Sequence, residues 1–149
     1  MGEVRFYHLT ERPLESVLPV MLEKSLERGW RVLVRGTEPA RIEALANDLW
    51  TYRDDSFLPH GTAREGSPDA QPVYLTLGDD NPNGANVLFL VDGADFSAPA
   101  DYERIVYLFD GRDEDALSQA RGSWKTAKAA GIRTTYWQQE QGGRWVKRA

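Results

Sequence analysis

Short apolar runs alternate with helical patterns along the first third of this chain, and this alternation restricts the possible folds more than any other feature. The run from Val4 to Leu9 is followed by a helical pattern that ends near Arg28. A second run, Arg31 to Arg35, contains three consecutive apolar residues, and another helical pattern opens at Thr37. Consecutive apolar residues are typical of a strand buried on both faces, as in a parallel sheet. The order strand, helix, strand, helix therefore predicts a parallel sheet with right-handed crossovers.

The rest of the chain continues this organisation. Further apolar runs predict strands at Val73–Leu77, Asn86–Val91, Arg104–Phe109, Ile132–Gln138 and Trp145–Lys147. One more helix is expected over Asp113–Gly131, and Tyr52–Gln71 is expected to form one long loop because its periodicity is lost. Turn-forming residues join the first two of these runs, which are therefore candidates for a hairpin. We expect a single α/β domain over residues 1–149 with a mostly parallel central sheet.

Composition and charge narrow the classes of function. The net charge of -5 argues against broad attraction to nucleic acid phosphates, because that attraction needs many uncompensated Lys and Arg residues. The absence of Cys excludes disulfides, thiolate metal sites and thiol nucleophiles. The sequence begins without the apolar run of a signal peptide, and no segment approaches the ~18 apolar residues of a membrane span. A cytoplasmic protein that binds a protein or a small ligand, and no membrane, is expected.

The turns that would hold a phosphate group in a nucleotide enzyme lack the necessary residues. The first strand-to-helix turn, Leu9–Pro13, has no glycine-rich segment and no Lys-Ser or Lys-Thr pair. The second, Arg35–Glu38, contains one glycine, which an ordinary turn explains. His8 and His60 are the only imidazoles, so no metal site is expected. Since His8 falls within the first strand, a structural role is favoured for it.

Aspartates at predicted strand ends leave a second class of function open. Asp92 and Asp110 each precede a glycine at the end of a strand, where carboxylates can hold Mg²⁺ or act as acid and base. Asp-Gly is also an ordinary turn dipeptide, and we favour that interpretation. The alternative to a binding protein is therefore a small α/β nucleotide- or metal-dependent enzyme that uses these strand-end aspartates.

The predicted helix over Asp113–Gly131 carries a basic and aromatic stripe. Arg121, Lys125 and Lys128 follow helical spacing, and Trp124 lies between them on the border of a face of small residues. Acidic residues at the start of a helix and basic residues at its end also complement the helix dipole, which is the simpler explanation of the charges. The dipole does not account for a large aromatic side chain among the cations. The stripe is therefore a candidate binding surface.

A second candidate surface lies between the second helix and the long loop. Trp50 ends that helix, and Phe57, Pro59 and His60 follow it in the chain. These residues have two interpretations, which the sequence does not separate. They either enter the core and hold the loop, or they form exposed anchors for a partner protein.

These segments, taken in order, resemble the chi subunit of bacterial DNA polymerase III holoenzyme, a part of its clamp-loader assembly. The segments that carry the resemblance are Phe6–Leu9, Leu49–Trp50, Ser56–His60, Pro72–Val73, Trp124–Lys125, Ala129–Gly131 and a C-terminal region containing Trp. Each is short, but their order is specific and spans nearly the whole chain. The resemblance implies a single-domain three-layer Rossmann-like α/β fold, with helices on both faces of a mostly parallel sheet and no phosphate-binding loop. It also implies an accessory subunit with no catalytic residue, metal or cofactor.

The resemblance implies two protein partners. The acidic C-terminal tail of single-stranded DNA-binding protein would bind Arg121, Trp124 and Lys125, with Lys128 as a nearby cation. A terminal Phe needs an apolar wall and its carboxylate needs a cation, and this stripe offers both. DNA would then be reached only indirectly.

The second implied partner is psi, the subunit that tethers chi to the clamp loader. Psi would dock on Trp50, Phe57, Pro59 and His60, and in some relatives the same face receives a repair helicase.

The sequence departs from the family pattern at two positions near the basic stripe. Leu117 stands one turn before Arg121, where a Lys is expected, and Asp110 occupies a position that is apolar elsewhere. Both changes should weaken binding of an acidic tail. Lys128 and Arg133 are candidates to supply the positive charge that is missing at these two positions.

Overall fold

A single sheet organises the molecule, with the strand order β3-β4-β2-β5-β6-β1-β7-β8. The computed structural model describes residues 2–51, 60–62, 67–78, 80–95 and 101–149, and within them all side chains except those of Trp50 and Pro68. The elements are β1 (Glu3–Leu9), α1 (Leu14–Glu27), β2 (Val32–Arg35), α2 (Pro39–Thr51), β3 (His60–Gly61), the 3₁₀ turn η1 (Pro68–Ala70), β4 (Val73–Thr76), β5 (Val87–Leu90), β6 (Arg104–Asp110), α3 (Glu114–Ala129), β7 (Arg133–Gln139) and β8 (Trp145–Lys147). The pairing is parallel throughout except between β7 and β8. The prediction of a mostly parallel sheet is confirmed.

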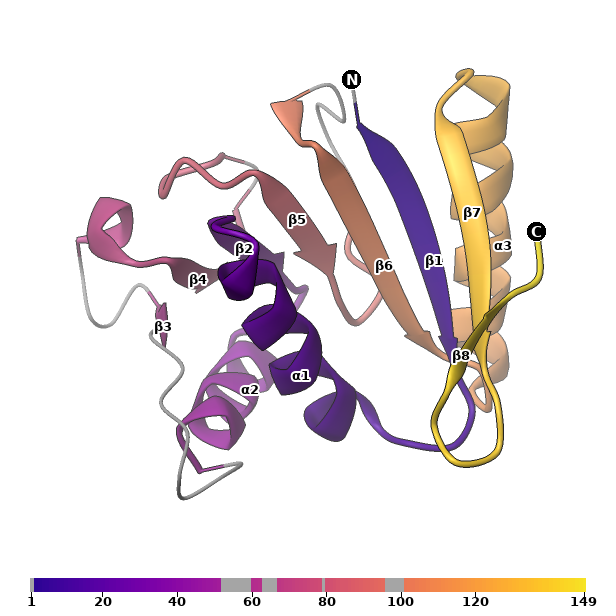
Figure 1. Cartoon of the computed structure of the whole chain (residues 1–149), viewed down its shortest axis with the longest axis horizontal. Helices are drawn as coiled ribbons and strands as arrows, with labels where there is room; N and C mark the ends of the chain where they lie inside the picture. The colour runs from indigo at the N-terminus through magenta and orange to yellow at the C-terminus, as the bar shows by residue number, and fades with distance from the viewer. Residues whose placement is uncertain (1, 52–59, 63–66, 79, 96–100) are drawn as a thin grey trace.

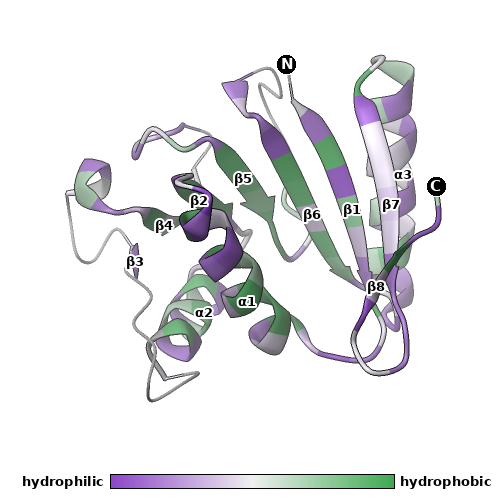
Figure 2. Cartoon of the chain, in the orientation of Figure 1, coloured by the Kyte–Doolittle hydropathy of each residue, from purple (hydrophilic) through white to green (hydrophobic). Residues whose placement is uncertain are grey.

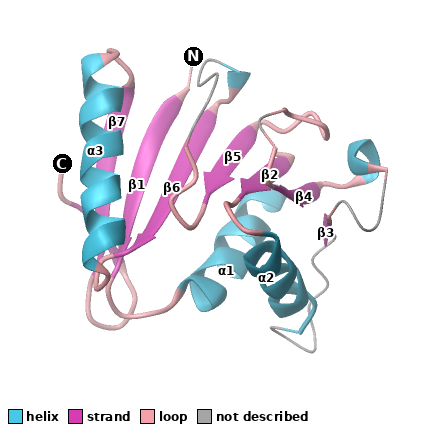
Figure 3. Ribbon diagram, turned by 180° about the vertical axis from the view of Figure 1, so that it is seen from behind, coloured by secondary structure: helices cyan, strands magenta, loops and turns pink. Residues whose placement is uncertain are grey.

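Helices cover both faces of this sheet, as predicted. Figures 1 and 3 show α1 and α2 on one face and α3 on the other. The first face buries Leu18, Leu22 and Leu45 of these two helices against apolar residues of the central strands. On the opposite face, Phe6 and Ala120 belong to a second apolar cluster. Figure 2 shows the central strands as strongly hydrophobic and β7 as more polar. No helix within the described residues is both long enough and apolar enough to cross a membrane.

The boundaries of α3 follow from local signals at its two ends. The Asp113 carboxylate accepts hydrogen bonds from the backbone N–H groups of Asp115 (2.9 Å) and Ala116 (3.3 Å), which makes Asp113 the N-cap. At the other end, Gly131 has a positive φ of 76°, which glycine adopts without steric cost. The backbone N–H of Ile132 then bonds to the carbonyl of Ala127 at 3.0 Å and closes the last turn. The predicted helix is confirmed to within a residue or two at each end.

The expected hairpin between β4 and β5 is wrong. Both strands pair in parallel with β2, one on each side of it, so residues 77–86 carry the chain from one end of the sheet to the other. The described turn-forming residues belong to the connection between these two parallel strands. The Asn83 amide donates to the carbonyls of Val32 (3.0 Å) and Gln71 (3.1 Å), and the Arg31 guanidinium donates to the Asn83 carbonyl (2.6 Å). These long-range hydrogen bonds hold the crossing segment against the amino ends of the strands.

The expected long loop over residues 52–71 contains regular structure in its described part. His60–Gly61 forms β3, which pairs in parallel with β4, and Pro68–Ala70 forms the 3₁₀ turn. A two-residue strand has too little periodicity to be recognised in a sequence. Its position at the edge of the sheet depends on β4, which comes later in the chain.

Candidate functional site

Three cations of α3 are exposed, and its small residues face the sheet. Arg121, Lys125 and Lys128 are all exposed to solvent. Ala120 and Ala127 are 2% and 0% exposed and lie against the sheet. The acidic first turn and Lys128 in the last turn do complement the helix dipole, but Arg121 lies in the middle of the helix, where the dipole has little effect. The structure therefore separates a packing face from a basic face, as the sequence predicted.

Trp124 lies on the border between these two faces and is held by aromatic neighbours. Its indole is half-buried and packs edge-to-face on Phe6 of β1 (centroids 5.4 Å apart) and on Tyr136 of β7 (5.8 Å). The Lys128 ammonium lies 5.0 Å from the centroid of the same indole, within the range of a cation–π interaction. The indole is therefore a fixed apolar surface with a cation next to it, and both features suit an aromatic anionic ligand.

Two residues beneath this helix belong to the same neighbourhood: His8, for which the sequence favoured a structural role, and Tyr136, which the sequence did not single out. His8 Nδ1 lies 2.6 Å from the hydroxyl of Tyr136, at the carboxyl end of β1. Burial lowers the pKa of His8, the Arg121 charge lowers it further, and the Asp110 charge opposes both. Burial raises the pKa of Tyr136, whereas the Arg121 charge opposes that shift. Arg121 is therefore close enough to act on both groups.

A signal for His8 was present in the sequence. Side chains alternate between the two faces of a strand, so His8 shares its face with Val4 and Phe6, the face that packs under α3. The sequence contained no comparable indication that Tyr136 contacts His8. The sequence does not show that β7 lies next to β1, so only the sheet order identifies the pair.

The two departures from the family pattern have structural roles. Leu117 is half-buried and packs against the apolar cluster under α3, so it contributes hydrophobic contact where a Lys is expected. Asp110 is exposed and accepts hydrogen bonds from the backbone N–H (2.9 Å) and the guanidinium (3.3 Å) of Arg112. The Asp110 charge is thus partly offset by Arg112 before any ligand arrives.

The second predicted surface is described only in part. Phe57 and Pro59 lie outside the described residues, and the structure gives only the backbone of Trp50, near the end of α2. His60 is 3% exposed, and its Nε2 lies 2.9 Å from the carbonyl oxygen of Ala46 in α2. His60 therefore connects β3 to α2, and its ring does not form part of the solvent-exposed surface. Of this surface the structure describes only His60 and the backbone of Trp50, and neither lies next to the stripe on α3.

The strand-end aspartates are paired with arginines. Both oxygens of Asp92 accept hydrogen bonds from the Arg41 guanidinium, at 3.1 and 3.2 Å, and Arg41 also lies 3.5 Å from Glu15. A cavity of about 430 Å³ lies at this end of the sheet, lined by these residues and by Asp110 and Arg112 among others. The part of the chain that the structure describes contains no group of three His, Asp or Glu residues placed to hold a metal ion. The pairing with arginine suits a structural role for these carboxylates better than catalysis.

Comparisons with known proteins point to one family. A family model described as "DNA polymerase III chi subunit, HolC" matches residues 1–135. The chain is 27% identical over 109 residues to a "Probable DNA polymerase III subunit chi" of Rickettsia prowazekii (strain Madrid E), covering 73% of this chain and 66% of that protein. It is 32% identical over 92 residues to the "DNA polymerase III subunit chi" of Pseudomonas aeruginosa PAO1, covering 59% of this chain and 63% of that protein. The chain spans just under two thirds of the length of each of these relatives.

Proposed function

Since this chain belongs to the DNA polymerase III chi subunit family, we propose that it is a non-catalytic accessory subunit that joins the clamp loader to single-stranded DNA-binding protein during replication. The acidic C-terminal tail of single-stranded DNA-binding protein binds α3, and psi binds the edge of the sheet near the end of α2. DNA is then contacted only through the partner, and the complex works in the bacterial cytoplasm. The observation that carries this proposal is the combination of a fixed indole and exposed cations on α3.

The chemistry of α3 fits each part of an acidic tail that ends in Phe. The terminal aromatic side chain packs against the exposed part of Trp124 and the aliphatic stem of Lys125, which remove it from water. The terminal carboxylate pairs with Arg121 or Lys125, where a charge-assisted hydrogen bond is stronger than a neutral one. Acidic residues further along the tail are attracted to Lys128, which already lies over the Trp124 ring.

The tail site is small and local because most of the protein is acidic. A net charge of -5 repels other anions at long range, whereas the cations of α3 attract them within about one Debye length, roughly 8–10 Å. This arrangement favours a short anionic peptide over a nucleic acid, whose charge extends along its whole length. The tail-binding helix can therefore select a protein partner even though single-stranded DNA is nearby.

The proposed psi site occupies the other end of the molecule. Strand β3 is the edge of the sheet furthest from β8, and the buried His60 holds that edge to α2. We assign docking of psi, or of a repair helicase in its place, to the surface predicted from Trp50, Phe57, Pro59 and His60. The separation of the two sites along the sheet lets one chi subunit hold both partners at once.

Isothermal titration with a peptide tests the tail site. The peptide carries several aspartates, ends in Phe and has a free C-terminal carboxylate. We expect binding that weakens with salt, and an affinity about tenfold or more lower for Lys125→Ala and for Trp124→Ala. Amidation of the peptide terminus should cause a similar loss. Lys147→Ala, an exposed substitution on β8, is the matched control and should bind normally. Unchanged affinity in both α3 variants would refute the site.

A further inference from the structure

Part of the sheet face that carries α1 has no helix over it. In Figure 1, α1 and α2 lie in front of the half of the sheet that contains β2 and β5, whereas the described residues place no helix in front of β1 and β7. Parallel sheets usually have both faces covered, and their strands are then apolar on both sides. Here β7 is more polar than the central strands, as Figure 2 shows. The side chains on this uncovered part therefore meet solvent or a partner.

A groove of about 320 Å³ runs between α1 and the uncovered strands. Its floor is formed by Tyr7, Val106 and Trp137 of β1, β6 and β7. Val20 and Met21 of α1 form one wall, and Val20, at 46% exposed, is one of two exposed large apolar side chains in the described part of the chain. The groove thus offers apolar surface to a ligand while remaining open to water along its length.

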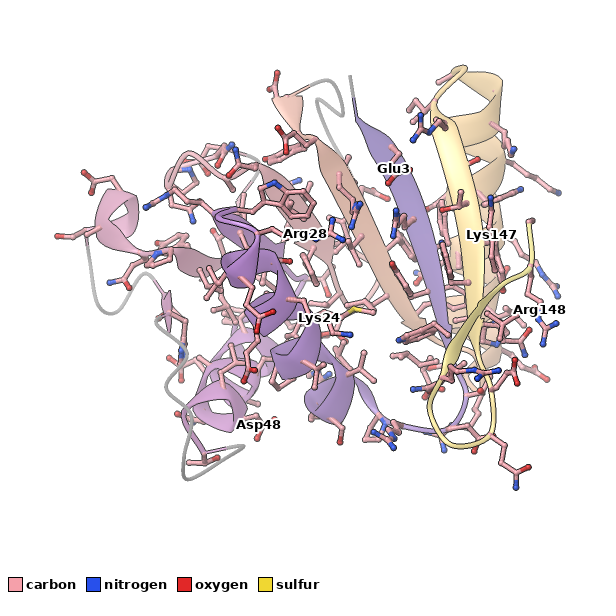
Figure 4. All side chains as sticks on the ribbon, in the orientation of Figure 1. Glu3, Lys24, Arg28, Asp48, Lys147 and Arg148 are labelled. Carbon is pink, nitrogen blue, oxygen red and sulfur yellow. The ribbon has the colours of Figure 1, made fainter. Side chains whose placement is uncertain are left out.

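The charged residues that line this groove are all positive. They are Arg5, Arg12, Lys24, Arg28 and Arg104, and the part of the chain that the structure describes contributes no Asp or Glu to the lining. This is a local reversal of sign in a chain whose net charge is -5. Figure 4 shows this face, with labels on Lys24 of α1, on Arg28 directly after that helix and on Glu3 of β1.

Among the described residues, Glu3 forms ion pairs with several of the cations at this place. Glu3 lies next to the groove and forms ion pairs with Arg5 (2.9 Å), Arg104 (3.2 Å) and Arg133 (3.3 Å). One negative charge is therefore shared among three positive charges. Burial lowers the pKa of Arg104, the positive charges of Arg5 and Arg28 lower it further, and Glu3 and Tyr7 act in the opposite direction. The arginines therefore repel one another, and a bound anion would relieve that repulsion.

We propose that this groove binds a segment of a partner protein that is acidic and carries a large apolar side chain. The apolar side chain enters between α1 and Trp137, and the carboxylates pair with the arginine and lysine residues along the groove. Guanidinium groups bind carboxylates with two parallel hydrogen bonds, which gives such a site orientation as well as affinity. The groove and α3 lie on opposite faces of the sheet, so this second site does not depend on the tail site.

Single-stranded nucleic acid fits the groove less well, for two reasons. Binding of that kind uses open aromatic faces on which bases stack, but the arginines already lie over the indoles here. Arg28 and Arg104 are each 5.0 Å from the centroid of Trp30, and Arg5 is 5.5 Å from that of Trp137. A nucleic acid strand would also extend beyond the groove into the acidic remainder of the surface. A short acidic peptide needs only the local positive charge.

Fluorescence anisotropy with the full chain tests this proposal. The probe is a short labelled peptide in which aspartates flank two phenylalanines, with an amidated C-terminus so that it lacks the terminal carboxylate required on α3. We expect Lys24→Glu and Val20→Asp each to weaken binding about tenfold or more, because both change exposed groove residues without disturbing the core. Lys125→Glu on α3 is the matched control and should bind the probe normally. Unchanged affinity in both groove variants overturns the proposal.

Further probes and a second measurement separate the possible ligands. A peptide with serine in place of phenylalanine should bind at least about tenfold more weakly, because the apolar side chain supplies much of the affinity. Tighter binding of an oligothymidylate of equal charge, sensitive to the same groove substitutions, would overturn the assignment to a peptide. In NMR spectra, the indole N–H signals of Trp137 and Trp145 should shift on titration and that of Trp124 should not. A shift of Trp124 alone would place the peptide on α3 and refute the groove.

The two peptide sites can fail independently. If the groove variants bind the amidated probe normally while Lys125→Ala still weakens binding of the carboxylate-terminated peptide, the groove proposal fails and the tail site stands. The reverse pattern refutes the tail site alone.

Discussion

Replacement of Trp124 by alanine tests whether this residue holds α3 to the sheet. Trp124 is the half-buried side chain that joins the exposed face of the helix to the aromatic residues beneath it. Its indole contacts Phe6 and Tyr136 edge-to-face, and both partners lie on strands, so the contacts cross from helix to sheet. Trp124→Ala removes both contacts and leaves Leu117 and the small residues of α3 to hold the helix in place.

The expected loss of stability can be worked from these contacts. An edge-to-face aromatic pair contributes about 0.5–1.5 kcal/mol beyond the burial of its surface, so two pairs contribute about 1–3 kcal/mol. Exposing the buried part of the indole adds roughly 1 kcal/mol. The free energy of unfolding should therefore fall by about 2–4 kcal/mol. For a chain of this length each kcal/mol lowers Tm by roughly 2–4 °C, so we expect a decrease of about 6–12 °C for a loss near the middle of that range.

Thermal unfolding followed by circular dichroism measures this decrease, and urea unfolding gives the free energy independently. Trp124→Phe keeps an aromatic ring and should lose less than half as much stability as Trp124→Ala. Lys125→Ala is the control, since Lys125 is exposed and its loss should leave Tm nearly unchanged. If Trp124→Ala melts within about 1–2 °C of the unsubstituted protein, the indole does not hold the helix and the argument for a fixed apolar wall fails.

Two further predictions concern other contacts in the structure. A β-carbon at Gly111 would overlap the His8 imidazole, so Gly111→Ala should turn that ring away from Tyr136. The free energy of unfolding in urea should fall by about 1–3 kcal/mol. A second substitution, His8→Ser, should relieve most of this loss, and strictly additive losses in the double variant would contradict the overlap. Burial alone would raise the pKa of Glu3, but the hydrogen bond and charge of Arg5 and the charge of Arg104 bring this pKa below the ordinary 4.5. Ionised Glu3 therefore stabilises the fold above that pH. This contribution is lost as the pH falls through the lowered pKa. The difference in unfolding free energy between the protein and Glu3→Gln should therefore be larger at neutral pH than in acid, and a difference that stays constant with pH would show that the ion pairs contribute nothing.

Local signals in the sequence were sufficient to predict most of the elements. The consecutive apolar residues Val32 to Val34 identified a strand buried on both faces, and the structure buries all of β2. Asp113 and Gly131 marked the ends of α3, because a cap or a positive φ depends only on residues a few positions away. The small residues Ala120 and Ala127 identified the packing face of that helix for the same reason.

The relations between distant segments required the tertiary structure. Turn residues between β4 and β5 predicted a hairpin, but β2 lies between these strands, and the local sequence carries no information about which strand is inserted there. His8 and Tyr136 are 128 positions apart, and only the pairing of β1 with β7 brings them under Arg121.

The basic groove shows the same division between sequence and structure. Its cations come from β1, α1, β6 and the residues that flank α1, and acidic or apolar residues separate them in the sequence. The sequence by itself determined most of the elements, the total charge and the exposed stripe of a single helix, because these depend on near neighbours and on composition. The tertiary structure alone decided which charges share a surface, because that depends on the order of the strands and on the part of one sheet face that the helices leave uncovered.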